Sequence, residues 1–227
     1  MGSKNILSEI PNNLHGPHPL SRHLCPICKL TKKLCICDFL PRIANRTPIT
    51  LAIHWRELRR KAGTSHLLRE CFTNVKTTVQ GVLRVPMSFD HIDESKPTYL
   101  LFPSEDATCA TELVGKDIQL IAVDGNWNQA KHMTKRHPYL KDLPKMVVPM
   151  RATTYRHLRE KQSHHMTSFE AITKAISILE PELKTQKAFD AYDLFATRWL
   201  SLRTSIPKTE VEKRTLEILS RDKKAKG

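Results

Sequence analysis

The chain has 227 residues, 40% of them hydrophobic, which is enough for one substantial domain with a small appendage. No apolar run reaches the length of a membrane span, so we expect no membrane partner. Lysine and arginine outnumber aspartate and glutamate by 37 to 23, which gives a formal net charge of +14. Such an excess favours a polyanionic partner, usually nucleic acid, and a basic protein without such a partner is the alternative.

The N-terminal part of the chain holds a cysteine cluster. Residues 1–20 are polar and lack a signal-peptide core, which predicts a flexible leader and a cytoplasmic protein. Residues 21–45 carry the pattern C-x2-C-x6-C-x-C, formed by Cys25, Cys28, Cys35 and Cys37. Two close pairs of thiolates can surround one ion tetrahedrally, so the pattern predicts a structural zinc module. Two disulfides or four unrelated thiols are the alternatives, and disulfides are rare in the cytoplasm.

Short apolar runs alternate with helical patterns from residue 46 onward. We expect strands at 49–54, 99–102, 118–123 and 146–148, and helices at 64–72, 126–136, 167–179, 188–203 and 208–220. This alternation predicts an α/β fold with a mostly parallel sheet flanked by helices. Ligand sites in such sheets gather at the carboxyl ends of the strands, so the polar residues after each strand are candidates for a functional site.

The most suggestive of these polar segments is Asp124-Gly125-Asn126-Trp127, directly after the strand at 118–123. An acid at the end of an apolar strand, next to glycine, can reach a ligand, whereas the alternative is that Asp124 caps the following helix. Trp127 is either a stacking surface for a base or a core residue. The sequence leaves both pairs of alternatives open.

A basic loop precedes the helix at 167–179. Tyr155 and Arg156, followed by Arg159, predict a clamp for a phosphate or carboxylate, and a solvated loop is the alternative. Thr167 and Glu170 predict a capping box, which also directs backbone N–H groups toward the end of this loop. Basic residues outnumber acidic ones by nine to two in residues 128–165 and by seven to two in residues 56–84, so we expect these stretches to face the polyanion.

Taken in this order, these residues resemble the DTW-domain family, in particular its tRNA-uridine aminocarboxypropyltransferases. The resemblance extends from the cysteine cluster to Glu180. It rests on the four cysteines and on His54…Glu57, Thr64, Leu101-Phe102-Pro103, Asp124…Trp127, Tyr155-Arg156 and Thr167…Glu170-Ala171. Two positions depart from the family pattern: Gly125 stands where threonine is expected, and the usual H-P-x-E appears as His54-Trp55-Arg56-Glu57.

The resemblance implies a SPOUT-like fold with a C-terminal trefoil knot, and S-adenosylmethionine as co-substrate. It also implies that the 3-amino-3-carboxypropyl group moves to N3 of a tRNA uridine, releasing methylthioadenosine. We accordingly divide the chain into a leader (1–20), a zinc-binding module (21–45), a DTW/SPOUT-like catalytic domain (46–207) and a charged C-terminal helix or tail (208–227). We expect a monomer without an obligate protein partner.

The resemblance assigns roles to individual residues. Asp124 matches the motif acid and is the predicted catalytic base. The predicted cofactor contacts are Leu101, Phe102, Pro103, Gly125, Trp127, Tyr155, Arg156, Thr167 and Glu170. The basic stretches supply the predicted tRNA contacts Arg56, Arg59, Arg60, Lys131, Lys135, Arg136 and Arg159. Two other hypotheses stay open: a SPOUT-type RNA methyltransferase with the same cofactor, and a non-catalytic, zinc-containing RNA-binding protein.

Overall fold

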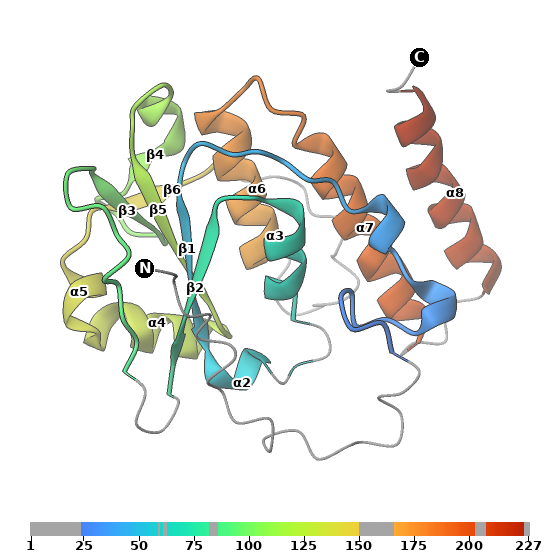
Figure 1. Ribbon diagram of the computed structural model, residues 1–227, viewed down its shortest axis with the longest axis horizontal. Helices are drawn as coiled ribbons and strands as arrows, with labels where there is room; N and C mark the ends of the chain where they lie inside the picture. Colours follow the sequence, from blue (N-terminus) through green and yellow to red (C-terminus); the bar gives the residue numbers. More distant parts are fainter. Residues whose placement is uncertain are drawn as a thin grey trace, which may run out of the picture.

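The computed structural model describes residues 24–58, 60, 63–81, 86–149, 166–202 and 208–224. Within this part of the chain, six strands form one parallel sheet in the order β2-β1-β5-β3-β6-β4 (Figure 1). Their bounds are β1 Ile49–His54, β2 Val75–Gln80, β3 Thr98–Leu101, β4 Thr108–Cys109, β5 Gln119–Asp124 and β6 Lys145–Val147. The four predicted strands are confirmed to within one residue, and β2 and β4 are additional.

Helices cover both faces of the sheet. They are α2 Trp55–Leu58, α3 Ser65–Cys71, α4 Trp127–Arg136, α5 Pro138–Lys141, α6 Ser168–Leu179, α7 Gln186–Ser201 and α8 Lys208–Lys224. The five predicted helices correspond to α3, α4, α6, α7 and α8. No helix among the described residues is long and apolar enough to cross a membrane.

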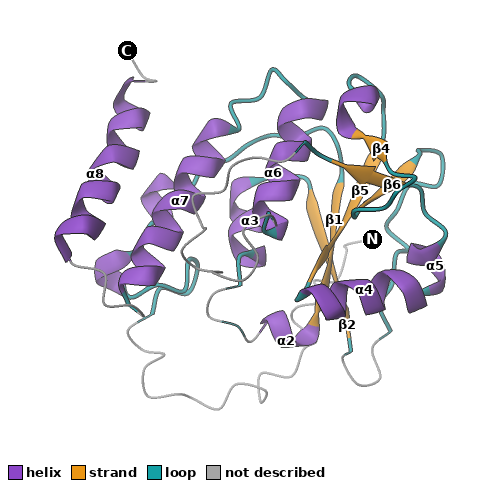
Figure 2. Cartoon of the chain, turned by 180° about the vertical axis from the view of Figure 1, so that it is seen from behind, coloured by secondary structure: helices purple, strands orange, loops and turns teal. Residues whose placement is uncertain are grey.

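The strand residues alternate between the two faces, as a pleated strand requires. Leu51 and Ile53 of β1 belong to a buried cluster with residues of α3, α6 and α7. Ala52, between them, belongs to a second cluster with residues of α4 and α5. Figure 2 shows the resulting three layers, with α4 and α5 on one side of the sheet and α3, α6 and α7 on the other.

The order of the strands defines where a ligand site is expected. Because all pairings are parallel, the carboxyl ends of the strands meet at one edge of the sheet, which we call the carboxyl edge. Neighbouring strands β1 and β5 lead to helices on opposite faces, α3 and α4 respectively. Such a reversal marks the usual place for a ligand in an open α/β sheet, and we call this expected site between the two strand ends the crevice. The C-terminal trefoil knot stays a prediction, since residues 150–165, between β6 and α6, lie outside the described residues.

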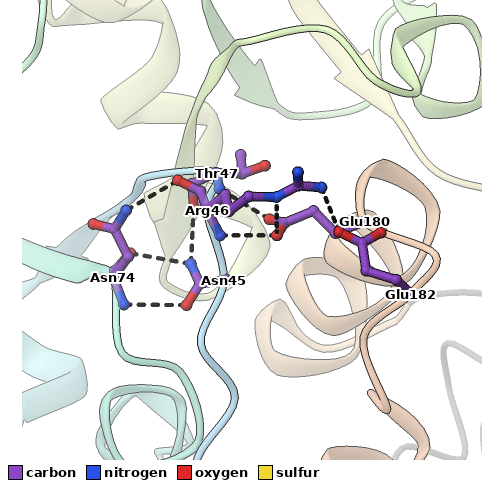
Figure 3. Close-up of polar contacts among 6 residues, drawn as sticks. All are labelled: Asn45, Arg46, Thr47, Asn74, Glu180 and Glu182. Atoms are coloured by element: carbon purple, nitrogen blue, oxygen red, sulfur yellow. Dashed lines mark hydrogen bonds and ion pairs between the residues drawn. The ribbon is translucent and has the colours of Figure 1, made fainter.

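Helix α6 crosses the molecule from the carboxyl edge to the opposite, amino edge of the sheet. At its first turn, Ser168 Oγ lies 3.5 Å from the carbonyl oxygen of Val123 in β5. Just past its last turn, Glu180 is only 2% exposed, and its carboxylate accepts hydrogen bonds from the backbone N–H groups of Arg46 at 2.8 Å and Thr47 at 2.9 Å (Figure 3). Glu180 therefore fixes the segment that leads into β1.

We expect a Glu180→Gln variant to lose about 1–3 kcal/mol of unfolding free energy, since its amide oxygen can keep one of the two backbone hydrogen bonds while its NH2 group cannot accept the other. Glu182→Gln is the matched control, because Glu182 also pairs with Arg46 but is exposed. Exposed pairs contribute about 0–1 kcal/mol. Urea denaturation measures both variants, and equal losses would contradict the anchoring role of Glu180.

Candidate functional site at the carboxyl edge

Asp124 is the last residue of β5 and lies at the crevice between β1 and β5. Its side chain is only 8% exposed. The N-cap of α4 is Asn126, whose Oδ1 accepts from the backbone N–H of Gln129 at 2.9 Å, while Gln129 Oε1 accepts from the N–H of Asn126 at 2.8 Å. The alternative that Asp124 caps the helix is therefore wrong. Its carboxylate is held at the carboxyl end of a central strand.

The end of β1 brings a neutral histidine next to this strand. Ile53 pairs with Asp124 in the sheet, and His54 follows it. Burial, together with the positive charges of Arg56 and His132, lowers the pKa of His54. The backbone N–H of Arg56 donates to His54 Nδ1 at 3.3 Å, so the neutral ring carries its proton on Nε2. The sequence motif contained His54, but its proximity to His132 of α4 depends on the fold.

Trp55, which stands where the family pattern has proline, packs against the end of the neighbouring strand β2. Gly81 has a positive φ of 86°, and a Cβ at this position would lie 2.4 Å from Trp55 Cδ1. Only glycine therefore fits beneath the indole ring. Arg56 Cζ lies 5.5 Å from the centroid of the Trp55 ring. After it, Glu57 is buried, and its Oε1 lies 3.3 Å from Arg60 Nε.

An aromatic pair flanks Asp124 on the side of β3. The rings of Phe102 and Trp127 stack with centroids 5.5 Å apart and an angle of 10° between their planes. Lys131 Nζ, one turn further along α4, lies 5.2 Å from the centroid of the Trp127 ring. Trp127 is 38% exposed, so the alternative that it is a core residue is wrong. Phe102 and Trp127, both predicted cofactor contacts, are thus brought together.

The beginning of α6 faces the same edge. Thr167 Oγ1 accepts from the backbone N–H of Glu170 at 3.3 Å, and Glu170 Oε2 accepts from the backbone N–H of Thr167 at 2.9 Å. The predicted capping box is confirmed. Ser168 ties this turn to the end of β5, so Thr167 and Glu170 lie beside the strand that carries Asp124. The Glu170 carboxylate is engaged in the cap.

The remaining predicted site residues differ in their burial and in whether the structure describes them. Leu101 is half-buried and packs against the core, and Pro103 is exposed. Gly125 lies under α4, where an added Cβ would be 3.1 Å from Gln129 Cβ. A threonine at this position, as in the family pattern, would crowd the residue that completes the cap of α4. Some of the predicted site residues lie outside the described residues, namely Arg59, Tyr155, Arg156 and Arg159.

Positive charge surrounds the crevice from both sides. Helix α4 contains no acidic residue, and Lys131, Lys135 and Arg136 are exposed on it. Arg56 and Arg60 lie across the crevice, in and after α2. Of these basic residues, Arg56 directly follows β1 and Lys131 lies one turn into α4, so both are close to the carboxyl edge, whereas Lys135 and Arg136 lie in the last turn of α4.

The four cysteines form a group that can hold a metal ion. Their sulfur atoms all lie within 4.8 Å of one another, with Cys25 and Cys37 Sγ 3.4 Å apart and Cys28 and Cys35 Sγ 3.7 Å apart. Tetrahedral Zn–S bonds of about 2.3 Å place sulfurs roughly 3.8 Å apart, so the donor set fits zinc. None of the four is in a disulfide, whose S–S bond is about 2.05 Å, so that alternative is wrong.

Within the cysteine group, the local environment favours the thiolate form of Cys25. Burial raises the pKa of Cys28 and Cys37. Burial acts in the same direction at Cys25, but hydrogen bonds from the backbone N–H groups of Cys28 and Ile27, together with those from the side chains of Cys37 and Cys35, outweigh it and lower its pKa to about 7. Burial lowers the pKa of His66 to about 4, so its neutral ring donates from Nε2 to the carbonyl oxygen of Cys28 at 3.3 Å. Metal binding needs such thiolates and such outer-shell support.

The fold and this edge define a three-layer α/β protein with a candidate ligand site at the carboxyl ends of a parallel sheet and a cysteine group suited to a metal. Comparison with known sequences identifies the family within this class. The pattern of the DTW domain matches residues 22–200, and the chain belongs to the DTW-domain family.

Two curated relatives carry the same name. The chain is 26% identical over 178 residues to tRNA-uridine aminocarboxypropyltransferase 2 of Drosophila melanogaster, which covers 73% of this chain and 71% of the relative. It is also 26% identical over 175 residues to tRNA-uridine aminocarboxypropyltransferase 2 of Mus musculus, covering 72% of this chain and 58% of the relative, less than two thirds of its length. No solved structure matches.

Proposed function

We propose that this chain transfers the 3-amino-3-carboxypropyl group of S-adenosylmethionine to N3 of a uridine in tRNA and releases methylthioadenosine. The observation that carries the proposal is Asp124, an acid 8% exposed at the carboxyl end of the central strand β5. It lies beside the stacked pair Phe102–Trp127. The names of the two relatives support the same reaction.

The proposed chemistry is a displacement at carbon. N3 of uridine carries a proton at neutral pH, and Asp124 accepts it as N3 attacks the methionine Cγ next to the sulfonium. The N3–C bond forms, the C–S bond breaks, and its electron pair stays on sulfur, which leaves as the neutral thioether methylthioadenosine. Selection of Cγ over the methyl carbon depends on positioning, because the site must align Cγ between N3 and sulfur.

In this proposal, other residues around the crevice bind the co-substrate. Phe102 and Trp127 offer flat apolar surfaces to the adenosine part of the co-substrate. Arg156 binds the methionine carboxylate, assisted by Tyr155 or Thr167. In support, α6 begins at the end of β5, so the chain re-enters the described structure near Asp124, after leaving it beyond the carboxyl end of β6, two strands away in the sheet. The knot implied by the SPOUT-like family is part of the same proposal.

The basic surface of α2 and α4 is proposed to bind tRNA, and zinc is the proposed ion of the cysteine group. Phosphate contacts position the RNA, while the uridine must be accessible or flipped into the crevice to reach Asp124. The exposed cations Lys131, Lys135 and Arg136 support this assignment. Binding should accordingly weaken steeply with salt.

The deciding experiment is a product analysis with purified protein, S-adenosylmethionine and unmodified bulk tRNA. Mass spectrometry should detect methylthioadenosine and a matching mass gain on uridine. Detection of S-adenosylhomocysteine would instead establish methyl transfer and overturn the proposed reaction. Neither product from folded protein that binds both tRNA and co-substrate would also contradict it.

A further inference from the structure

The cysteine module lies at the same edge of the molecule as Asp124. Helix α3 follows β1 and leads back to the start of β2, so its first turn is at the carboxyl edge. His66, the second residue of α3, holds the carbonyl oxygen of Cys28 at 3.3 Å. The module is therefore attached to the end of α3 that faces the crevice.

Helix α7 also holds the cysteine module, through residues near its C-terminal end. Helix α7 runs back after α6, and Arg198 lies in its last turn. Arg198 Nη1 donates to the carbonyl oxygens of Cys35 at 2.6 Å and Leu34 at 3.3 Å. Figure 1 shows the module beside α7. Because Leu30 and Ile36 of the module are buried in the cluster that includes α3 and α7, the module is a fixed part of the domain surface.

The outward side of the module has the chemistry of an RNA-binding surface. Lys29, Lys32 and Lys33 are exposed, and none of them forms an ion pair within the described part of the chain. Asp38 is the one acid among residues 24–45. Phe39, in the same module, is 39% exposed, and its ring lies 5.9 Å from Arg198 Cζ. Three free ammonium groups with an exposed aromatic ring match phosphates and unstacked bases.

We propose that this lysine surface of the cysteine module, formed by Lys29, Lys32 and Lys33, is a second tRNA contact that binds backbone phosphates at a distance from the reacting uridine. The inference rests on the proposed function, since it takes tRNA as the polyanion. One RNA can touch both surfaces because the module is attached at the carboxyl edge, where α2 begins after β1 and where α4 begins on the opposite face of the sheet. The cysteine group then has a role in substrate binding as well as in folding.

The test compares two double variants of equal charge change. Lys32→Glu/Lys33→Glu alters the proposed surface. Lys116→Glu/Lys184→Glu is the control, since Lys116 precedes β5 and Lys184 follows α6, so both are exposed at the amino edge. Equilibrium binding of bulk tRNA without co-substrate should weaken at least tenfold in the first and less than threefold in the control. The slope of log affinity against log salt should fall by about 1–2 in the first variant only.

Equal weakening in both variants would overturn the inference, because it would show only the effect of net charge. Zinc content and thermal unfolding establish that both variants keep an intact module. The proposed function is tested separately by methylthioadenosine release from the unaltered protein. A protein that makes this product but binds tRNA equally through both variants refutes the second contact alone. One that makes no product but loses tRNA only in the first variant refutes the reaction alone.

Discussion

An Asp124→Asn variant is expected to fold and bind S-adenosylmethionine like the unaltered protein, yet to lose turnover by about 10²–10⁴-fold, the usual contribution of a positioned general base. Asparagine keeps the size of the buried side chain, but its amide cannot take the proton from N3 of uridine. Methylthioadenosine release under single-turnover conditions measures the chemical step, and calorimetry measures binding of the co-substrate. A large loss of rate with unchanged binding is the signature of a group that acts in the reaction.

Asp117→Asn is the matched control for this substitution. Asp117 is exposed, lies at the amino edge just before β5, and pairs with Lys96 at 2.8 Å. The same loss of one charge at this site should change turnover less than twofold. If Asp124→Asn retains more than a tenth of the normal rate, Asp124 is not the base, and its burial at the strand end has a structural reason.

The central elements could be predicted because their sequence patterns are strong. Strand β5 contains the continuous apolar run 120–123 and is buried at every position, and β1 is buried at five of its six positions. Strand β2 reads Val-Lys-Thr-Thr-Val-Gln and lies at the edge of the sheet with Lys76 exposed, so it lacks such a run. Strand β4 has only two residues and exists through its pairing with β6. Edge strands depend on partners that the local sequence does not contain.

The candidate site was predicted in part. Asp124 and Asn126 are both suitable helix caps, so the sequence alone could not decide which one starts α4. The backbone makes Asn126 the cap and leaves Asp124 at the strand end. The fit of Trp55 over Gly81 joins the ends of two strands, and the stacking of Phe102 on Trp127 also joins separate segments. Predicting such contacts requires knowledge of the strand order in the sheet, and the residue patterns do not specify that order.

Zinc removal is expected to lower the melting temperature by on the order of 10 °C. Without the ion, the short segments of the cysteine module lose their common centre, and buried Leu30 and Ile36 become exposed. Exposure of two such side chains costs about 3–6 kcal/mol. One kcal/mol corresponds to roughly 2–4 °C for a protein of this size. Scanning calorimetry of the protein with and without a chelator measures the shift, and metal analysis should find one zinc per chain.

A Cys28→Ser variant should reproduce this loss, because Cys28 is fully buried and serine is a poor zinc ligand. Cys109→Ser is the control, since Cys109 lies outside the cysteine group and should leave the melting temperature within about 2 °C, as expected for substitutions away from the core. The two proposals for the module also predict an order of effects. Cys28→Ser should weaken tRNA binding more than binding of S-adenosylmethionine, because the proposed lysine surface belongs to the module while Phe102 and Trp127 follow β3 and β5 of the sheet. Equal loss of both ligands would mean that the module supports the whole domain and has no separate part in binding RNA.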